Sequence, residues 1–281
     1  AHGIVAKVAD ESAAEARQAR VLHHPEAREV VGYVGERVGT TRGPALDIAV
    51  DPLECTASVA FGRPNAITVM ATGPKGSLYR AADSYMEKIA VGQKAKKAID
   101  LDASPRENIR KVAAALGKDI RELTVAILDR PRHEKLIAEV RTAGARIQLF
   151  TDGDIAMAIA TCIRESPIDL LLGIGGSAEG VISAAAVKCL GGEILVRWKP
   201  KDKTHVARLH AAGVKNFDKI LSSENLASGG ELTFAATGVI SGPLAEGIVI
   251  RPEATITHSL VISGNPPLIR RIETKHLKAN F

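Results

Sequence analysis

The stretch NIRKVAAALGKDIRELTVAILDRPRHEKLIAEVRTAGARIQLF, Asn108 to Phe150, decides the fold class. Apolar residues recur in it first at helical spacing, then as a short run, and then in the same order again. The alternation continues to Leu190 and predicts helices over Asn108–Leu116, Pro131–Ala143, Ile155–Cys162 and Ala178–Leu190, and strands over Leu123–Leu128, Arg146–Phe150 and Ile168–Gly173. Such alternation is typical of crossover units on a mostly parallel sheet.

The residues before this stretch have a different pattern of apolar residues. Apolar and small residues from Ile4 to Leu22 follow helical spacing and predict an amphipathic helix. The period-two alternation of Ala45–Val50 predicts a strand that ends at Asp51-Pro52. Ala66–Thr72 and Ser77–Tyr79 flank a turn-forming Gly-Pro-Lys-Gly segment and predict a hairpin. The first third therefore reads as an antiparallel meander.

The expected fold class is α/β, with an N-terminal mixed or antiparallel sheet and a C-terminal mostly parallel sheet. Two further strands are expected in the tail, near Glu231–Ala236 and Thr255–Ile262, and these return to a sheet. We place the domain boundary between residues 104 and 105, which gives an N-terminal subdomain of residues 1–104 and a C-terminal α/β subdomain of residues 105–281.

The composition excludes several classes of protein. With 281 residues, of which 46% are hydrophobic and 25% charged, the chain is neither disordered nor fibrous. Five Phe, three Tyr and one Trp are few rings for a protein that stacks single-stranded nucleic acid. Lys and Arg outnumber Asp and Glu by 37 to 32 and are scattered along the chain, which does not predict a polyanion-binding stripe. We therefore expect no nucleic-acid partner.

The location of the protein is inferred from two features. No apolar run approaches the roughly 20 residues that a membrane-spanning helix needs, so no membrane partner is expected. Cys55, Cys162 and Cys189 form no CxxC pair and leave one cysteine over, as expected in a reducing compartment. The predicted location is the cytoplasm.

The densest polar cluster is Asp51-Pro52-Leu53-Glu54-Cys55-Thr56, at the end of the predicted strand Ala45–Val50. Two carboxylates three residues apart on a turn can bind one hard divalent cation, and the following hydroxyl can orient a bound water. The alternative is a solvated loop in which the Asp caps the next element. Spacing alone favours neither.

A second cluster, Gly173-Ile174-Gly175-Gly176-Ser177-Ala178-Glu179-Gly180, lies between a predicted strand and a predicted helix. Glycines at such a turn let backbone amides approach a ligand, and the start of a helix favours anions. Glu179 has two interpretations: it interacts with the helix dipole, or it binds a cation shared with the first cluster.

Two more polar junctions follow predicted strands: Arg130-Pro131-Arg132-His133 and Asp152-Gly153-Asp154. Open α/β sheets bind ligands at the carboxyl ends of their strands, so these junctions are expected to face one crevice. Arginines suit a phosphate and aspartates suit sugar hydroxyls. The alternative interpretation makes Arg132 and His133 ordinary surface residues and Asp152 a helix cap.

Six motifs together resemble the class II fructose-1,6-bisphosphatases. They occur in order across residues 35–275 and read VDPLECT (Val50–Thr56), DSYMEKIAVG (Asp83–Gly92), ILDRPRH (Ile127–His133), TDGD (Thr151–Asp154), GIGGSAEG (Gly173–Gly180) and FAATGV (Phe234–Val239). The resemblance implies the layered αβαβα sugar-phosphatase fold, Mg²⁺ or Mn²⁺ as cofactor, and removal of the 1-phosphate from a sugar bisphosphate. It also implies a homodimer or homotetramer.

The resemblance also implies roles for individual residues. Asp51, Glu54 and Glu179 match metal ligands, and Thr56 matches the threonine that helps to activate the attacking water, with Asp51 and Glu54 in the same catalytic group. Substrate contacts are implied for Glu54, Cys55, Thr56, Tyr85, Arg130, Pro131, Arg132, Asp152, Gly153, Asp154 and Gly176.

This sequence departs from the family pattern in two places. The family has a further acidic segment before the residues that match Gly35–Gly39, with a metal-binding Asp and a Glu ligand, and this chain lacks it. Cys55 stands where the family has glycine. We therefore expect a diverged member that acts on fructose 1,6-bisphosphate or sedoheptulose 1,7-bisphosphate. The alternative is a protein that binds sugar phosphates, or converts them without hydrolysis, after losing part of its metal site.

Overall fold

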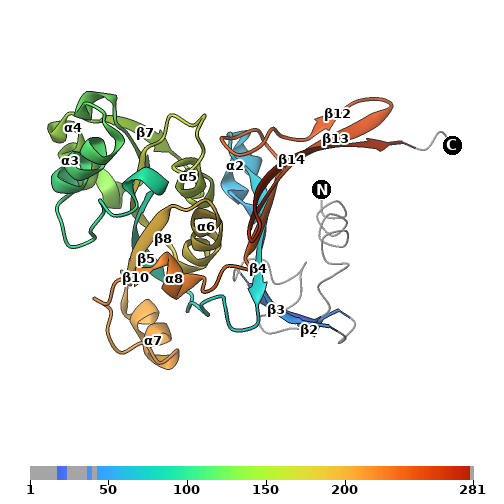
Figure 1. Ribbon diagram of the computed structural model, residues 1–281, viewed down its shortest axis with the longest axis horizontal. Coiled ribbons are helices and arrows are strands. Elements are labelled where there is room, and N and C mark those ends of the chain that lie inside the picture. Colours follow the sequence, from blue (N-terminus) through green and yellow to red (C-terminus); the bar gives the residue numbers. More distant parts are fainter. Residues whose placement is uncertain (1–17, 24–36, 40–42, 279–281) are drawn as a thin grey trace. The chain divides into compact units, whose positions relative to one another are not determined.

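The computed structural model describes residues 18–23, 37–39 and 43–278. The chain forms two compact units, one made of Ala1–Leu78 with Gly230–Phe281 and the other of Tyr79–Gly229 (Figure 1). The sequence predicts a boundary between residues 104 and 105. The units divide differently because the C-terminal strands pair with the N-terminal ones, so the first unit consists of both ends of the chain. Among the described residues no helix is both long and apolar enough to cross a bilayer.

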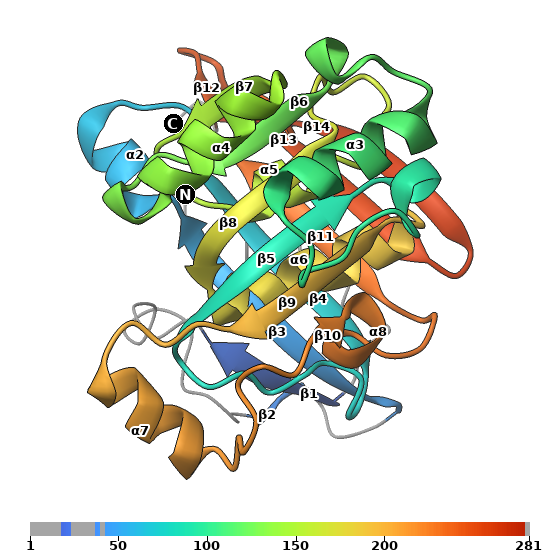
Figure 2. The same cartoon turned by 90° about the vertical axis from the view of Figure 1, so that its left-hand side faces the viewer.

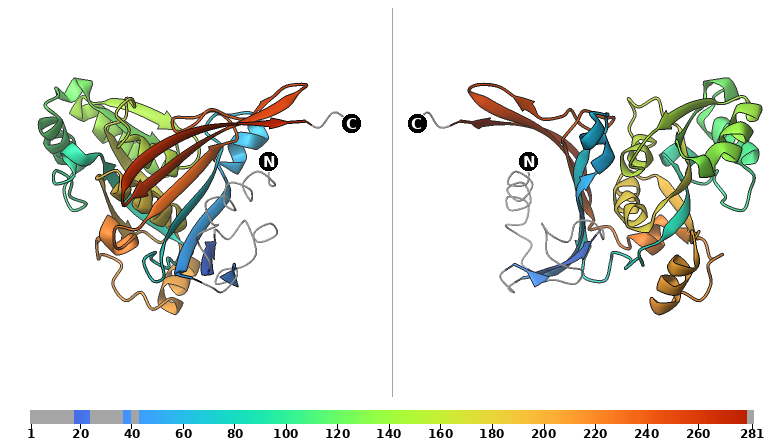
Figure 3. Two further views of the ribbon diagram at one scale, coloured as in Figure 1. Left: turned by 45° about the vertical axis from the view of Figure 1, so that its right-hand side comes forward. Right: turned by 180° about the vertical axis from the view of Figure 1, so that it is seen from behind.

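The first unit is built on an eight-stranded sheet with the order β12-β13-β11-β4-β3-β1-β2, and β14 pairs with β13. Its described elements are β1 (Gln18–His23), β2 (Arg37–Val38), β3 (Ala45–Glu54), α2 (Thr56–Phe61), β4 (Ile67–Pro74), β11 (Thr233–Gly238), β12 (Val249–Ile250), β13 (Ala254–Gly264) and β14 (Pro267–Leu277). Figure 3 shows β13 and β14 as a long antiparallel pair. Phe234, Ile67 and Ile262 are fully buried and form part of the core of this unit.

The tail strands are confirmed as β11 and β13, and both belong to the first sheet. The predicted hairpin is wrong: β4 pairs with β3 and β11, and Leu78 makes only an isolated bridge. Residues 18–22 of the predicted N-terminal helix are also not helical, because β1 occupies Gln18–His23 and pairs in parallel with β3. The rest of the predicted N-terminal helix lies outside the described residues.

The second unit is built on a six-stranded sheet with the order β10-β9-β5-β8-β6-β7. Its strands are β5 (Tyr85–Val91), β6 (Thr124–Leu128), β7 (Arg146–Phe150), β8 (Leu170–Gly176), β9 (Glu193–Trp198) and β10 (Leu221–Ser222). Its α-helices are α3 (Pro105–Leu116), α4 (Glu134–Ala143), α5 (Ile155–Ala160), α6 (Ser177–Cys189), α7 (Lys203–Ala211) and α8 (Ser223–Leu226), and short 3₁₀ helices cover Gln93–Ala95 (η2), Ile120–Glu122 (η3) and Pro131–His133 (η4).

The predicted α/β fold with two sheets is confirmed, and the second sheet is mixed. β6 runs parallel to both β7 and β8, whereas β5 runs antiparallel to β8 and β9. Helices α3 and α4 lie on one face of this sheet and α6 on the other (Figure 2). The run LLLGIGG of β8 is apolar without alternation because both of its faces are covered.

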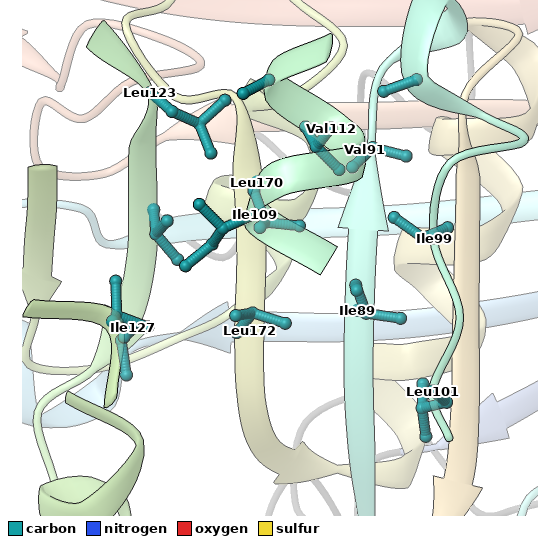
Figure 4. Close-up of a cluster of buried hydrophobic side chains, with 14 of the residues drawn as sticks. Ile89, Val91, Ile99, Leu101, Ile109, Val112, Leu123, Ile127, Leu170 and Leu172 are labelled. Carbon is teal, nitrogen blue, oxygen red and sulfur yellow. The ribbon is translucent and has the colours of Figure 1, made fainter. Parts of the chain in front are cut away.

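The core between the sheet and the pair α3 and α4 is aliphatic (Figure 4). Ile109 and Val112 of α3 pack there against Leu170 of β8 and Ile127 of β6, and all four side chains are fully buried. The helix α3 begins at Pro105, after Ser104, whose hydroxyl accepts a hydrogen bond from the Glu107 amide at 3.2 Å. This packing fixes the positions of β6 and β8, whose carboxyl ends carry the candidate site residues.

Candidate active site

The site residues of the first unit lie at the end of β3. The strand continues past the predicted end at Asp51-Pro52 to Glu54, and its register with β4 shifts between Asp51 and Glu54. The irregularity allows Asp51 Oδ1 to accept a hydrogen bond from the Leu53 amide at 3.0 Å. Both carboxylate residues are buried, with 7% of Asp51 and 4% of Glu54 exposed, so the solvated-loop interpretation is wrong for this segment.

The chain then turns sharply into α2. Cys55 has φ 70° and ψ 50°, in the left-handed region that favours glycine, and this turn places Thr56 as the first residue of α2. The Cys55 side chain is buried, and its Sγ accepts a hydrogen bond from Asn65 Nδ2 at 4.0 Å. Thr56 is exposed. The backbone at Cys55 thus has the conformation for which a glycine is the natural residue.

The site residues of the second unit gather at one edge of its sheet. Because β6 lies between β7 and β8 and runs parallel to both, the segments that follow these three strands leave the sheet at the same edge. These segments carry Arg130, Asp152 and Glu179, and Tyr85 at the start of antiparallel β5 pairs with Gly176 at the end of β8. Three polar junctions thus lie together, as the sequence predicts.

Contacts at this edge join the predicted residues to one another. Arg130 Nη2 lies 3.6 Å from Asp152 Oδ1. The Arg132 guanidinium donates to the Ile174 carbonyl from Nη2 at 2.7 Å and from Nε at 3.2 Å, and its central carbon lies 5.4 Å from the centre of the Tyr85 ring. Pro131 opens the 3₁₀ turn between the two arginines. Of the five N–H donors of Arg132, these contacts use two.

Asp154 is held by a residue that sequence reasoning missed. Lys88 of β5 donates to Asp154 Oδ2 at 2.7 Å, and both side chains are buried. Burial raises the pKa of the Asp154 carboxyl, and the nearby ammonium of Lys88 opposes this rise. Asp154 Oδ1 is buried without a hydrogen-bond partner in the described part of the chain. A lysine inside the apolar strand YMEKIAV was the signal available in the sequence.

The glycines of this edge accommodate side chains. A Cβ at Gly176 would collide with the Glu179 carboxylate, and one at Gly175 with that of Asp154. Gly153 has φ 64°, which allows the turn between the two aspartates. The Gly-rich turn therefore lets the carboxylates of Asp154 and Glu179 lie against the backbone at the end of β8.

The comparison with protein families decides the ancestry. The model of the family described as "Bacterial fructose-1,6-bisphosphatase, glpX-encoded" matches residues 21–276. The chain belongs to this family. Curated relatives include "Fructose-1,6-bisphosphatase 1 class 2" of Escherichia coli (strain K12) and "Fructose-1,6-bisphosphatase class 2" of Shigella flexneri. Each is 44% identical to the chain over 257 residues, which is 87% of this chain and 76% of the relative.

Enzymes of this fructose-1,6-bisphosphatase family depend on a metal. Asp51 and Glu54 are buried, and their carboxylates supply the hard oxygen atoms that divalent cations prefer as ligands. Glu179 belongs to the other unit. Within residues 18–23, 37–39 and 43–278, no group of three or more His, Cys, Asp or Glu side chains forms a metal site by itself.

Proposed function

We propose that this chain is a metal-dependent phosphatase that hydrolyses the 1-phosphate of fructose 1,6-bisphosphate. The observation that carries the proposal is the family match over residues 21–276, which includes every candidate site residue. The names of the curated relatives specify the same substrate. Sedoheptulose 1,7-bisphosphate is proposed as a second substrate, because it presents the same phosphorylated end to the site.

The proposed roles follow from the chemistry of each side chain. Asp51, Glu54 and Glu179 hold the cation, for which we propose Mg²⁺ or Mn²⁺. When bound, this cation neutralises phosphate charge and lowers the pKa of a coordinated water. The hydroxyl of Thr56 orients the attacking water and accepts no proton on its own, because a neutral hydroxyl is too weak a base.

The remaining residues bind and orient the substrate. Arg130 and Arg132 bind a phosphate through their free N–H donors, and Asp152 accepts hydrogen bonds from sugar hydroxyls. The same role is proposed for Asp154, whose Oδ1 has no hydrogen-bond partner among the described residues. Tyr85, Pro131, Gly153 and Gly176 contact the substrate beside these side chains, and Cys55 contributes backbone next to Glu54 and Thr56. We propose that the enzyme acts as a homodimer or homotetramer in the cytoplasm.

A phosphate-release assay tests the proposal. The purified protein is given fructose 1,6-bisphosphate, sedoheptulose 1,7-bisphosphate and fructose 6-phosphate, each with Mg²⁺, with Mn²⁺ and with a chelator. We expect one phosphate released per bisphosphate, none from fructose 6-phosphate, and none with the chelator. Binding of the bisphosphates without release under either ion would reject hydrolysis in favour of the non-catalytic alternative.

A further inference from the structure

Strands β6 and β8 stop pairing before either strand ends. They pair only at Val125 with Leu170 and at Ala126 with Leu171. Beyond these pairs β6 continues to Leu128 beside β7, and β8 continues to Gly176 beside β5. Backbone groups that face the opening between β6 and β8 therefore need partners other than each other.

The imidazole of His133 occupies this opening. Its Nδ1 lies 2.7 Å from the Leu128 carbonyl oxygen, and the Ile174 amide donates to its Nε2 at 2.8 Å. A carbonyl only accepts and an amide N–H only donates, so the ring is neutral, with its proton on Nδ1. Only 1% of His133 is exposed, so its interpretation as a surface residue is wrong.

Two neighbours of His133 depend on this arrangement. Gly173 has φ 152°, and a Cβ on it would lie 3.3 Å from the imidazole, so a glycine lets the ring lie against β8. Arg132 holds the carbonyl of Ile174, the same residue whose amide His133 holds. Consecutive side chains thus fix both polar groups of one residue, two positions before Gly176.

We propose that His133 is a positioning residue for the sugar-phosphate site, whose neutral imidazole replaces the missing hydrogen bonds between β6 and β8 and so fixes Ile174, to which Arg132 is anchored. The inference rests on the proposed function, because it assigns Arg132 to substrate binding. His133 does not touch the reacting atoms. Its effect is to keep the guanidinium of Arg132 and the turn at Gly175-Gly176 in one arrangement.

The surroundings of the ring support a neutral imidazole. Burial lowers the pKa of His133, the hydrogen bond to the Leu128 carbonyl opposes this, and the guanidinium groups of Arg132 and Arg130 lower it further. A proton on Nε2 would face the Ile174 N–H, another donor, and the bond between them would be lost.

The tautomer can be measured without any activity. Nitrogen-15 NMR of the histidine-labelled protein, with His133→Gln used to assign the signal, separates protonated from unprotonated ring nitrogens. We expect Nδ1 protonated and Nε2 unprotonated near neutral pH. A proton on Nε2, in either the neutral or the charged ring, would overturn the proposal.

Two substitutions test the effect on the site. His133→Gln keeps one donor and one acceptor, whereas His133→Leu fills the space with neither. We expect His133→Leu to raise the KM for fructose 1,6-bisphosphate, and the Kd for fructose 6-phosphate in a chelator, by about tenfold, and His133→Gln to restore most of the loss. Ile127→Val, at a buried apolar residue of β6, is the matched control and should leave both constants unchanged.

The outcomes separate this inference from the proposed function. If the wild-type protein binds fructose 6-phosphate but releases no phosphate from fructose 1,6-bisphosphate, the proposed hydrolysis is rejected. The role of His133 is then tested by the Kd values for fructose 6-phosphate. Equal KM and Kd values for His133→Leu and His133→Gln would overturn the positioning role, because a residue that only fills space gains nothing from a donor and an acceptor.

Discussion

At the scale of the residue, Cys55 has a side chain in a backbone conformation that favours glycine. Its φ of 70° is costly for any residue with a Cβ, by about 1–2 kcal/mol. We predict that Cys55→Gly is more stable than Cys55→Ala by about 1 kcal/mol, because both variants lose the sulfur but only glycine relieves the backbone. Urea unfolding of both variants measures the difference, and an alanine variant at least as stable as the glycine variant would contradict it.

The buried ion pair between Lys88 and Asp154 is the second residue-scale feature. Lys88→Met leaves a buried carboxylate without its cation, and we predict a loss of roughly 3 kcal/mol in the free energy of unfolding near neutral pH. Lys97→Met, at an exposed lysine that follows η2, is the control and should change the free energy little.

The pH dependence of the Lys88→Met loss has a defined sign. Burial raises the pKa of Asp154 in the folded protein, and removing Lys88 raises it further, so the folded variant takes up a proton that the unfolded chain does not. The stability lost by the variant should therefore decrease as the pH falls through the folded-state pKa, because a protonated carboxyl needs no cation. A loss that stays constant or grows on acidification would contradict this assignment.

At the scale of elements, Asn108 ties the start of α3 to the segment before it. Its side-chain amide donates to the carbonyls of Asp100, Ala103 and Ser104, and its oxygen accepts from the Asp100 amide. We predict that Asn108→Ala lowers the free energy of unfolding by about 2 kcal/mol, because buried backbone groups lose their partners. Thermal and urea unfolding measure the loss, with exposed Arg110→Ala as the control. Equal stability of the two variants would contradict the prediction.

Elements with a strong local pattern were predictable, and those fixed by pairing were not. The spacing from Asn108 to Phe150 predicts α3, β6, α4 and β7 within a few residues, because each buries one regular apolar face or run. The predicted hairpin failed because the strand partners of β4 come from distant β3 and β11. The spacing of apolar residues does not predict which strands pair when they are far apart in the sequence.

The candidate site divides in the same way. Its polar junctions were found because they follow apolar strands, and parallel pairing of β6 with β7 and β8 brings three of them to one edge. The roles of Lys88 and His133 were not predicted, because they depend on buried partners, Asp154 and Ile174, that are distant in sequence. Local sequence patterns therefore identify the residues that face a ligand. They identify less well the buried residues that hold those side chains in place.

At the scale of the whole molecule, the proposed metal ligands come from distant parts of the chain. The proposed metal ligands are divided between them, with Asp51 and Glu54 in one and Glu179 in the other. A cation that these residues hold would stabilise the folded chain, because it binds the folded arrangement and not the unfolded chain. We predict that Mn²⁺ raises the unfolding temperature of the wild type and does so less for Glu54→Gln. An equal rise in both proteins would contradict the role of Glu54.

The most direct test of the central claim is a double-mutant cycle on metal affinity. Electron paramagnetic resonance of free Mn²⁺ gives the dissociation constant for the wild type, Glu54→Gln, Glu179→Gln and the double variant, with exposed Glu122→Gln as the control. If Glu54 and Glu179 bind one cation, each single variant weakens binding, and the second substitution costs less in the presence of the first. If the double variant weakens Mn²⁺ binding by the product of the two single effects, or if Glu179→Gln leaves the dissociation constant unchanged, a shared cation is contradicted.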